Sequence, residues 1–203
     1  MNTAKETELK IANLLIKGNK IDNIGLLDGK TGLAIYFFQL ARTHHNEEYS
    51  LYASELLDEV IDSVNSSMPM DFATGLTGIG WGIEYLIQNK FIEADADEVL
   101  EELDASVCNF FIFNDLPLED IISVGRYYVS RLIYRIEDEQ SDAALEIKYN
   151  VILLIDELER QIENCKECTK ISQLLDDLYK LNIFNAKVLK LQQRLQNLMP
   201  AYL

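Results

Sequence analysis

The chain has 203 residues, enough for one sizeable core, and hydrophobic residues make up 48% of it, well above the range of disordered chains. Its formal net charge of −16, from 34 acidic and 18 basic residues, argues against a nucleic-acid partner, because phosphate binding needs clustered Lys and Arg. The same excess of acid argues against docking on an anionic membrane surface. It would attract a basic peptide or protein.

Residues 1–10 mix Lys and Glu and lack the apolar run of a signal peptide. Apolar runs such as Val151–Ile155 are far too short to cross a bilayer. Three cysteines in a chain of this size do not make a disulfide framework. The sequence therefore predicts a cytoplasmic protein.

Apolar residues recur at spacings of three and four along the whole chain, which is the pattern of amphipathic helices. Three prolines and nine glycines are too few for the turns of a sheet-rich fold. The sequence thus predicts an all-α protein. It begins with an N-terminal helix whose apolar positions are Leu9, Ala12, Leu15 and Ile16.

A Gly-x-x-Gly segment occurs at residues 29–32 and again at residues 75–78, which is 46 residues later. Each copy is followed by a short apolar helix and then by a longer acidic one. Moving 47 residues on from Gly78 reaches Gly125, where Ile122 replaces the first glycine of the pair. A fourth pair of helices keeps the spacing and has lost both glycines. Internal repeats of this length are typical of stacked helical hairpins.

These repeats predict one domain over residues 1–203, built from α/α helical hairpins that form an arc or partial toroid. The hairpins are expected at about residues 29–64, 75–113, 122–163 and 171–199. The expected first helices, short and facing inward, are Leu33–Ala41, Ile79–Asn89, Tyr127–Ile136 and Ile171–Lys180. The expected second helices, longer and more acidic, are Glu47–Val64, Ala94–Phe113, Ser141–Glu163 and Ala186–Met199.

The segments Gly25-Leu-Leu-Asp-Gly-Lys-Thr-Gly-Leu-Ala34 and Gly75-Leu-Thr-Gly-Ile-Gly-Trp81 resemble the repeat of the lanthionine synthetase C-like family. That resemblance implies an α/α toroid of double-helical hairpins, in which each inner helix is entered through a glycine-rich turn. It covers residues 24–107 well and the region after Pro117 only by helix spacing. Since the family's toroid has seven hairpins, four hairpins imply a partial ring.

Cyclases of this family bind zinc through one cysteine and a Cys-His pair, and they activate a peptide thiol with a catalytic histidine nearby. This chain contains no Cys-His dipeptide, and its only histidines are His44 and His45. No residue of that metal site can therefore be carried over to this sequence. We expect no metal, no cofactor and no catalytic residue of the cyclase type.

Other candidate chemistry is weak. Cys165 and Cys168 form a lone Cys-x-x-Cys among acids, where a structural role is favoured over zinc or redox chemistry. Cys108 fits a helical apolar pattern and is predicted to be a core residue. His44 and His45 follow a helix end, where a capping role is favoured.

Paired carboxylates could support glycoside hydrolysis, which also occurs on α/α toroids. Asp28, Asp71 and Glu84 are the candidates. Among 34 acids, however, three near turns or on an inner helix are expected by chance. An enzyme acting on a peptide or carbohydrate within the arc therefore stays an alternative.

The candidate ligand-binding residues lie on the second and third inner helices. They are Trp81, Arg126, Tyr127, Tyr128 and Arg131. The repeat spacing places Arg126 where earlier copies have Leu33 and Ile79, and Arg131 where they have Phe38 and Glu84. The arginines either pair with acids of adjoining helices or bind a ligand carboxylate. At least one of the three aromatic residues is expected to be partly exposed in a groove beside Arg126.

Together these features predict a non-catalytic helical-repeat protein whose inner surface binds a peptide or protein. The resemblance suggests an accessory role in a peptide-maturation pathway. A homo-oligomer, with the chain as half of a larger ring, is a further alternative.

Overall fold

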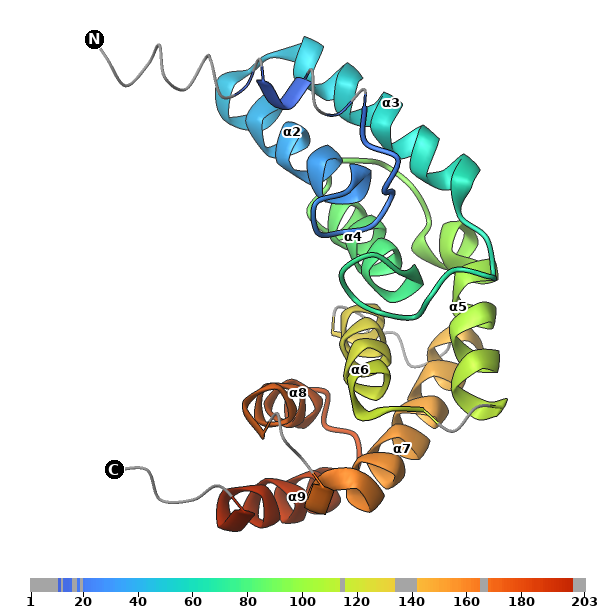
Figure 1. Ribbon diagram of the computed structural model, residues 1–203, viewed down its shortest axis with the longest axis vertical. Helices are drawn as coiled ribbons and strands as arrows, with labels where there is room; N and C mark the ends of the chain where they lie inside the picture. The colour runs from blue at the N-terminus through green and yellow to red at the C-terminus, as the bar shows by residue number, and fades with distance from the viewer. Residues whose placement is uncertain are drawn as a thin grey trace, which may run out of the picture.

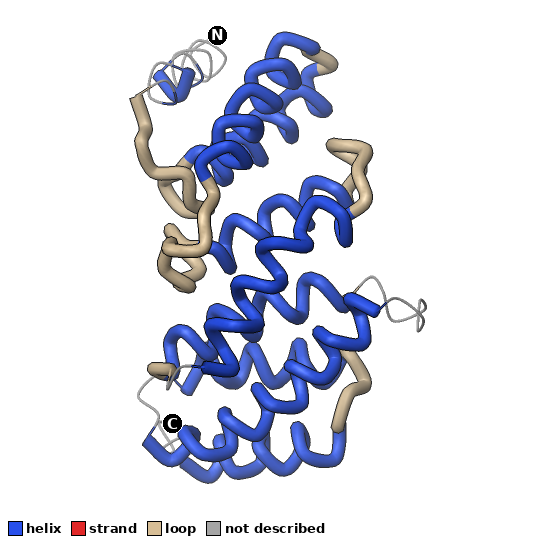
Figure 2. The backbone as a smooth tube through the Cα atoms, turned by 90° about the vertical axis from the view of Figure 1, so that its right-hand side faces the viewer, coloured by secondary structure: helices blue, strands red, loops and turns tan. Residues whose placement is uncertain are grey.

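The computed structural model describes residues 11, 13–15, 18, 20–113, 116–133, 142–164 and 168–198. Every regular element within these ranges is a helix (Figures 1 and 2). The α-helices are α2 (Lys30–His44), α3 (Glu47–Ser63), α4 (Leu76–Gln88), α5 (Ala96–Phe113), α6 (Leu118–Leu132), α7 (Asp142–Gln161), α8 (Cys168–Lys180) and α9 (Asn185–Leu198). A 3-10 turn, η1 (Ile162–Asn164), follows α7.

Consecutive helices pair as hairpins, and the hairpins stack into a curved arc (Figure 1). Helices α2, α4, α6 and α8 line the concave side, while α3, α5, α7 and α9 form the convex side. Along the concave side α4 packs against both α2 and α6, and α6 packs against α8. Figure 2 shows the hairpins stacked along the long axis of the molecule. The all-α fold of helical hairpins in an arc, predicted from the repeat, is confirmed.

The two Gly-x-x-Gly segments have the same local structure. Gly32 and Gly78 are each the third residue of their helix. Thr31 and Thr77, one position earlier, each donate a hydroxyl hydrogen bond to the carbonyl seven residues back, at 2.6 and 2.7 Å. A Cβ atom on either glycine would lie 2.0 Å from the carbonyl oxygen six residues back. Glycine is needed because the loop folds back on the helix and leaves no room for a Cβ atom. A positive φ angle is not the reason, since no glycine in the described ranges has one.

The third hairpin differs from the prediction at its start. Helix α6 begins at Leu118, nine residues before the predicted start at Tyr127 (118 against 127). Pro117 stands at the N-cap, and Glu119 and Asp120 occupy the first turn, where acidic side chains interact favourably with the helix dipole. The predicted start is wrong because the glycine spacing indicates a start near Tyr127, whereas this local signal begins the helix at Leu118.

Gly125 consequently lies inside α6 rather than in a turn. A Cβ atom there would approach Leu174 Cδ2 of α8 to 2.7 Å. This glycine therefore allows close packing between two inner helices. It keeps its place in the 46–47-residue spacing but serves a different purpose from Gly32 and Gly78.

The other predicted boundaries lie close to the observed ones. Helices α2 and α4 each begin three residues early (30 against 33, and 76 against 79). Positions 11, 13–15 and 18 of the expected N-terminal helix are helical, whereas Leu9, Ala12 and Ile16 fall outside the described residues. The expected end of the third inner helix at Ile136 also falls outside them. Within the described ranges, no helix combines the length and apolarity needed to cross a membrane.

The first two hairpins are joined at both ends of their inner helices. At one end Leu27 N donates to Ala73 O at 2.8 Å, which links the two glycine loops. At the other end Arg42 Nη2 donates to the carbonyls of Asn89 and Lys90 at 2.7 and 2.9 Å. The same guanidinium lies 3.6 Å from the ring centroid of Phe91. These contacts fix α4, which carries one wall of the groove described below.

Replacing Gly78 with alanine should reduce the free energy of unfolding by about 1–3 kcal/mol, the usual cost of overpacking. The added Cβ would collide with the carbonyl oxygen of Phe72, and backbone cannot move aside as a side chain can. Urea unfolding followed by circular dichroism measures the change. The control is Glu101→Ala on the exposed side of α5, which should change stability by no more than about 0.5 kcal/mol. Equal midpoints for the two variants would contradict the close loop–helix contact.

Candidate functional site: a groove on the concave side of the arc

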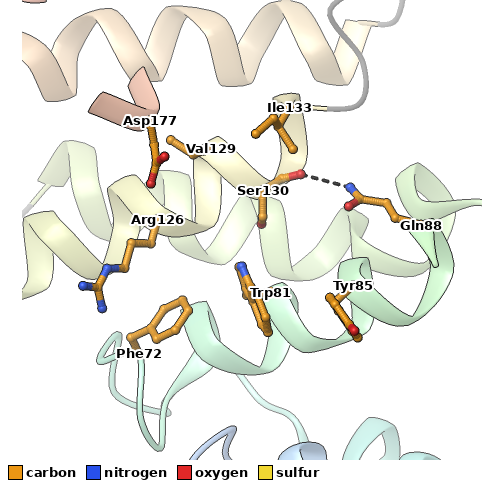
Figure 3. Close-up of a pocket in the computed structure, with 9 residues that line it drawn as sticks. All are labelled: Phe72, Trp81, Tyr85, Gln88, Arg126, Val129, Ser130, Ile133 and Asp177. Atoms are coloured by element: carbon orange, nitrogen blue, oxygen red, sulfur yellow. Dashed lines mark hydrogen bonds between the residues drawn. The ribbon is translucent and has the colours of Figure 1, made fainter. Parts of the chain in front are cut away.

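A groove of about 360 Å³ opens on the concave side between α4 and α6 (Figure 3). Its lining comes from the loop before α4 and from α4, α6 and α8. The lining residues are Phe72, Trp81, Tyr85, Gln88, Arg126, Val129, Ser130, Ile133 and Asp177. We call this site the α4/α6 groove. Its volume lies at the lower end of the range for ligand-binding clefts.

Three aromatic rings form one wall of the α4/α6 groove. Trp81 and Tyr85 lie one turn apart on α4, and their rings stack with centroids 5.4 Å apart and planes at 16°. The ring of Phe72 packs edge-on against Trp81 at 5.8 Å. Gln39 of α2 donates a hydrogen bond to the Tyr85 hydroxyl at 3.0 Å. The rings are thus held by their neighbours and present apolar surface that costs little conformational entropy to bury.

The groove has a charged end and a polar end. Arg126 Cζ lies 5.4 Å from the ring centroid of Phe72, within cation–π range. Figure 3 shows the guanidinium beside Phe72, with Gln88 at the opposite end of the groove. There Gln88 Nε2 donates to the backbone carbonyl of Ser130 at 3.0 Å, which ties α4 to α6. A ligand lying along the groove would therefore contact the Arg126 guanidinium at one end and the Gln88 carboxamide at the other.

The structure separates the five predicted ligand-binding residues into two groups. Trp81 and Arg126 are half-buried and line the same groove. Tyr127, Tyr128 and Arg131 are 0%, 1% and 0% exposed, so the prediction that they line a ligand-binding surface is corrected. Successive residues of a helix point in different directions. When Arg126 faces the concave side, the next two side chains must therefore point toward neighbouring helices.

Arg131 lies at the centre of a buried ionic cluster that joins three helices. Its Nη1 donates to Glu84 Oε2 of α4 at 2.6 Å. Its Nη2 donates to Asp97 Oδ1 at 2.8 Å and to Asp104 Oδ2 at 2.6 Å, both from α5. Tyr127 donates its hydroxyl to Asp104 Oδ1 at 2.5 Å. We call Arg131, Glu84, Asp97 and Asp104 the Arg131 cluster. Of the two roles considered for this arginine, the structure shows pairing with adjoining helices.

The environment keeps these groups in fixed protonation states. Burial lowers the pKa of the Arg131 guanidinium, but the hydrogen bonds and charge of Asp104 and the charge of Glu84 raise it overall. Burial, together with the charge of Asp104, raises the pKa of Tyr127 well above its ordinary value. Burial also raises the pKa of Tyr128. The arginine therefore stays charged, and the Tyr127 hydroxyl remains a hydrogen-bond donor.

The Arg131 cluster lies behind the α4/α6 groove and is linked to it. Gln88 Nε2 donates both to Glu84 Oε1, at 2.5 Å, and to Ser130 O in the groove lining. Glu84 and Arg131 stand on the same two helices that carry the groove walls. The cluster thus sets the separation of α4 and α6.

Sequence reasoning missed several residues of the groove. Tyr85 could have been found, because it lies four positions after Trp81 and therefore on the same helical face. Phe72 comes from an irregular loop, and Asp177 comes from the fourth hairpin. Nothing in sequence spacing indicates that these two residues reach the groove.

The other candidate groups stand apart from the groove. Cys108 is buried in α5, accepts a hydrogen bond from Asn150 at 3.1 Å, and has a thiol pKa raised mainly by burial. His44 is exposed in the last turn of α2, and His45 forms its left-handed C-cap. Cys168 begins α8, whereas Cys165 lies outside the described residues. In the part of the chain that the structure describes, no group of three His, Cys, Asp or Glu residues could hold a metal ion.

The three carboxylates considered for glycoside hydrolysis have structural surroundings. Glu84 belongs to the Arg131 cluster. Asp71 Oδ1 accepts from the backbone amides of Ala73 and Thr74 at 2.9 and 2.8 Å, which folds its own loop. Asp28 holds a left-handed turn with φ of 53°. None of the three lines the α4/α6 groove.

Replacing Arg131 with methionine should lower the free energy of unfolding by about 3–5 kcal/mol, as when one partner of a buried ion pair is removed. Three carboxylates would be left facing one another, with Glu84 only 3% exposed. The matched control is Arg126→Met, the same change five residues earlier on α6, at a half-buried position without an ion pair to any described residue. Urea unfolding should show only a small effect of the control. If both variants unfolded at the same midpoint, the cluster would not be the link between the hairpins.

We predict that the purified protein carries no zinc. Cys165 and Cys168 are the only cysteines with ligand spacing, and a zinc site needs further ligands. Metal analysis of protein prepared without chelators tests this expectation. A stoichiometric zinc ion that disappears in the Cys165→Ser variant would overturn it.

A scan against protein families matched residues 20–172 to the family described as lanthionine synthetase C-like protein. Searches of curated proteins and of solved structures found no match. The Cys-His pair through which the family's cyclases bind zinc is absent from this sequence. The matched region includes the glycine loops, α2 to α7 and the start of α8, and the chain therefore belongs to the lanthionine synthetase C-like family.

Proposed function

We propose that this chain is a non-catalytic member of its family that binds a peptide or protein segment in the α4/α6 groove. The observation that carries the proposal is the row of aromatic rings at Phe72, Trp81 and Tyr85, held in place on the concave side of the arc. Concave surfaces of helical-repeat proteins are well suited to extended partners. Aromatic side chains also contribute much of the binding energy where polypeptides associate.

The groove's dimensions and chemistry support a polypeptide ligand. A volume of about 360 Å³ accommodates one or two side chains of a larger partner rather than a whole folded domain. The wall offers apolar surface, and the ends offer Arg126 and Gln88, which can bind carboxylates and backbone amides. An extended peptide presents these groups together.

The non-catalytic part of the proposal rests on two features. The sequence lacks the Cys-His pair through which the family's cyclases bind zinc. Glu84 and Asp71, two of the three carboxylates considered for glycoside hydrolysis, are engaged in structural hydrogen bonds. Family membership favours an accessory role in a peptide-maturation pathway in the cytoplasm, in which the chain holds a precursor for another enzyme.

The chain's only tryptophan makes this proposal easy to test, since Trp81 reports on the groove alone. A random 12-residue peptide library displayed on phage would be selected on the folded protein. Enriched peptides, made synthetically, should change the emission of Trp81 on binding. In fluorescence anisotropy they should bind the Trp81→Leu variant at least about tenfold more weakly, a loss of about 1.4 kcal/mol.

Tyr149→Leu is the control, because it removes an aromatic side chain that is 59% exposed on the convex helix α7. It should bind the peptides like the unaltered protein. Unfolding curves verify that both variants are folded. Selected peptides that leave Trp81 emission unchanged and bind Trp81→Leu normally would reject the groove, and a peptide whose mass changes on incubation would reject the non-catalytic role.

A further inference from the structure

The geometry points to Arg126 as a specificity-determining residue that selects a segment carrying a carboxylate beside an aromatic or large apolar side chain. This inference rests on the proposed function and names the chemistry of the ligand that the α4/α6 groove would accept. The carboxylate would pair with the Arg126 guanidinium. The neighbouring apolar side chain would lie against Trp81.

Arg126 differs from the other arginines that the structure describes. Each of those arginines donates to a carboxylate or carbonyl oxygen within the chain. The pairs are Arg42 with Asn89 O and Lys90 O, Arg131 with its cluster, Arg160 with Glu157, and Arg194 with Glu159 and Glu163. Arg126 makes no hydrogen bond or ion pair with any described residue, and its guanidinium lies over the face of the Phe72 ring, with Cζ 5.4 Å from the ring centroid. Its N–H groups are therefore available to a ligand.

The two aspartates that line a pocket together with Arg126 have partners of their own. Arg126 and Asp177 lie between the α4/α6 groove and a smaller hollow that also includes Asp176 and Lys180. Asp177 pairs with Lys180 at 2.7 Å. Asp176 accepts a hydrogen bond from Gln192 at 2.7 Å. The charged residues of the groove lining are therefore Asp177, which pairs with Lys180, and Arg126, which has no ion pair with a described residue and remains for an incoming anion.

The position of the guanidinium determines which ligands it can select. It lies beside Phe72, the first ring of the row, while Trp81 is the next ring along. A carboxylate bound there is adjacent to the aromatic wall, so one short segment can use both. The planar fork of arginine suits paired hydrogen bonds to the two oxygens of a carboxylate. A glutamine on the ligand offers one uncharged acceptor oxygen, and a lysine offers none.

The test uses four acetylated peptides that differ only at one position or at the terminus. In a Gly-Ser background, one Phe is followed by Glu, Gln or Lys with an amidated C-terminus, and the fourth peptide has Phe-Gln with a free terminal carboxylate after the Gln. Trp81 emission measures each affinity. The Glu peptide should bind at least about tenfold more tightly than the Gln peptide, the value of one charge-assisted hydrogen bond. Recovery of tight binding by the fourth peptide would identify a chain terminus as an equally good source of the carboxylate.

The decisive comparison is between the unaltered protein and variants in which the charge at position 126 is removed or reversed. Arg126→Gln should bind the Glu and Gln peptides equally, and Arg126→Glu should prefer the Lys peptide. Both variants keep Trp81, and urea unfolding verifies that they remain folded. The control is Glu101→Ala on the exposed side of α5, which should keep the unaltered protein's preference for the Glu peptide.

Four outcomes would overturn the inference, and the last of them would overturn the proposed function as well. Equal binding of the Glu and Gln peptides by the unaltered protein would do so, as would a preference that persists in Arg126→Gln. If library-selected peptides bind in the groove but none of the four designed peptides does, the inference falls and the proposed function stands. If neither kind of peptide affects Trp81, both fall.

Discussion

The pairing of Arg131 with three carboxylates holds the two central hairpins in their relative positions. One guanidinium, 0% exposed, bonds to Glu84 on α4 and to Asp97 and Asp104 on α5 while belonging to α6. Removing an ion from water is costly unless its partners are well placed. Only a narrow range of positions for α4 and α6 therefore satisfies all of these bonds. The shape of the α4/α6 groove follows from that constraint, since its walls are the exposed sides of the same helices.

The same two helices thus divide their surfaces between the core and the groove. Toward the core, α6 contributes Tyr127, Tyr128 and Arg131, all almost fully buried. Toward the concave side it contributes Arg126, Val129 and Ser130. Gln88 connects the two sides, because it bonds to Glu84 behind the groove and to the Ser130 carbonyl within it. Packed side chains directly behind the proposed binding surface would favour preorganised recognition, which reduces the entropy lost on binding.

Much of the fold could be predicted because repeats and apolar spacing are local properties of a sequence. The paired glycines identified the first two hairpins, and Gly32 and Gly78 do occupy equivalent positions. The same reasoning failed at Gly125, which keeps the spacing but packs against α8. The site was harder to predict. Trp81 and Arg126 were found by residue type and position, but the direction in which Tyr127 and Arg131 point depends on how α6 rotates against its neighbours. Phe72 and Asp177 reach the groove only through tertiary structure.

The described helices form an arc that is open on one side, with the α4/α6 groove on its concave face (Figure 1). A closed ring admits a polypeptide only by threading one of its ends through the opening. An open arc can receive a chain laterally, at any point along its length. The peptide segment that we propose for the groove could therefore be internal to its own chain, with folded or modified regions on either side, and could leave without passing a terminus through the site.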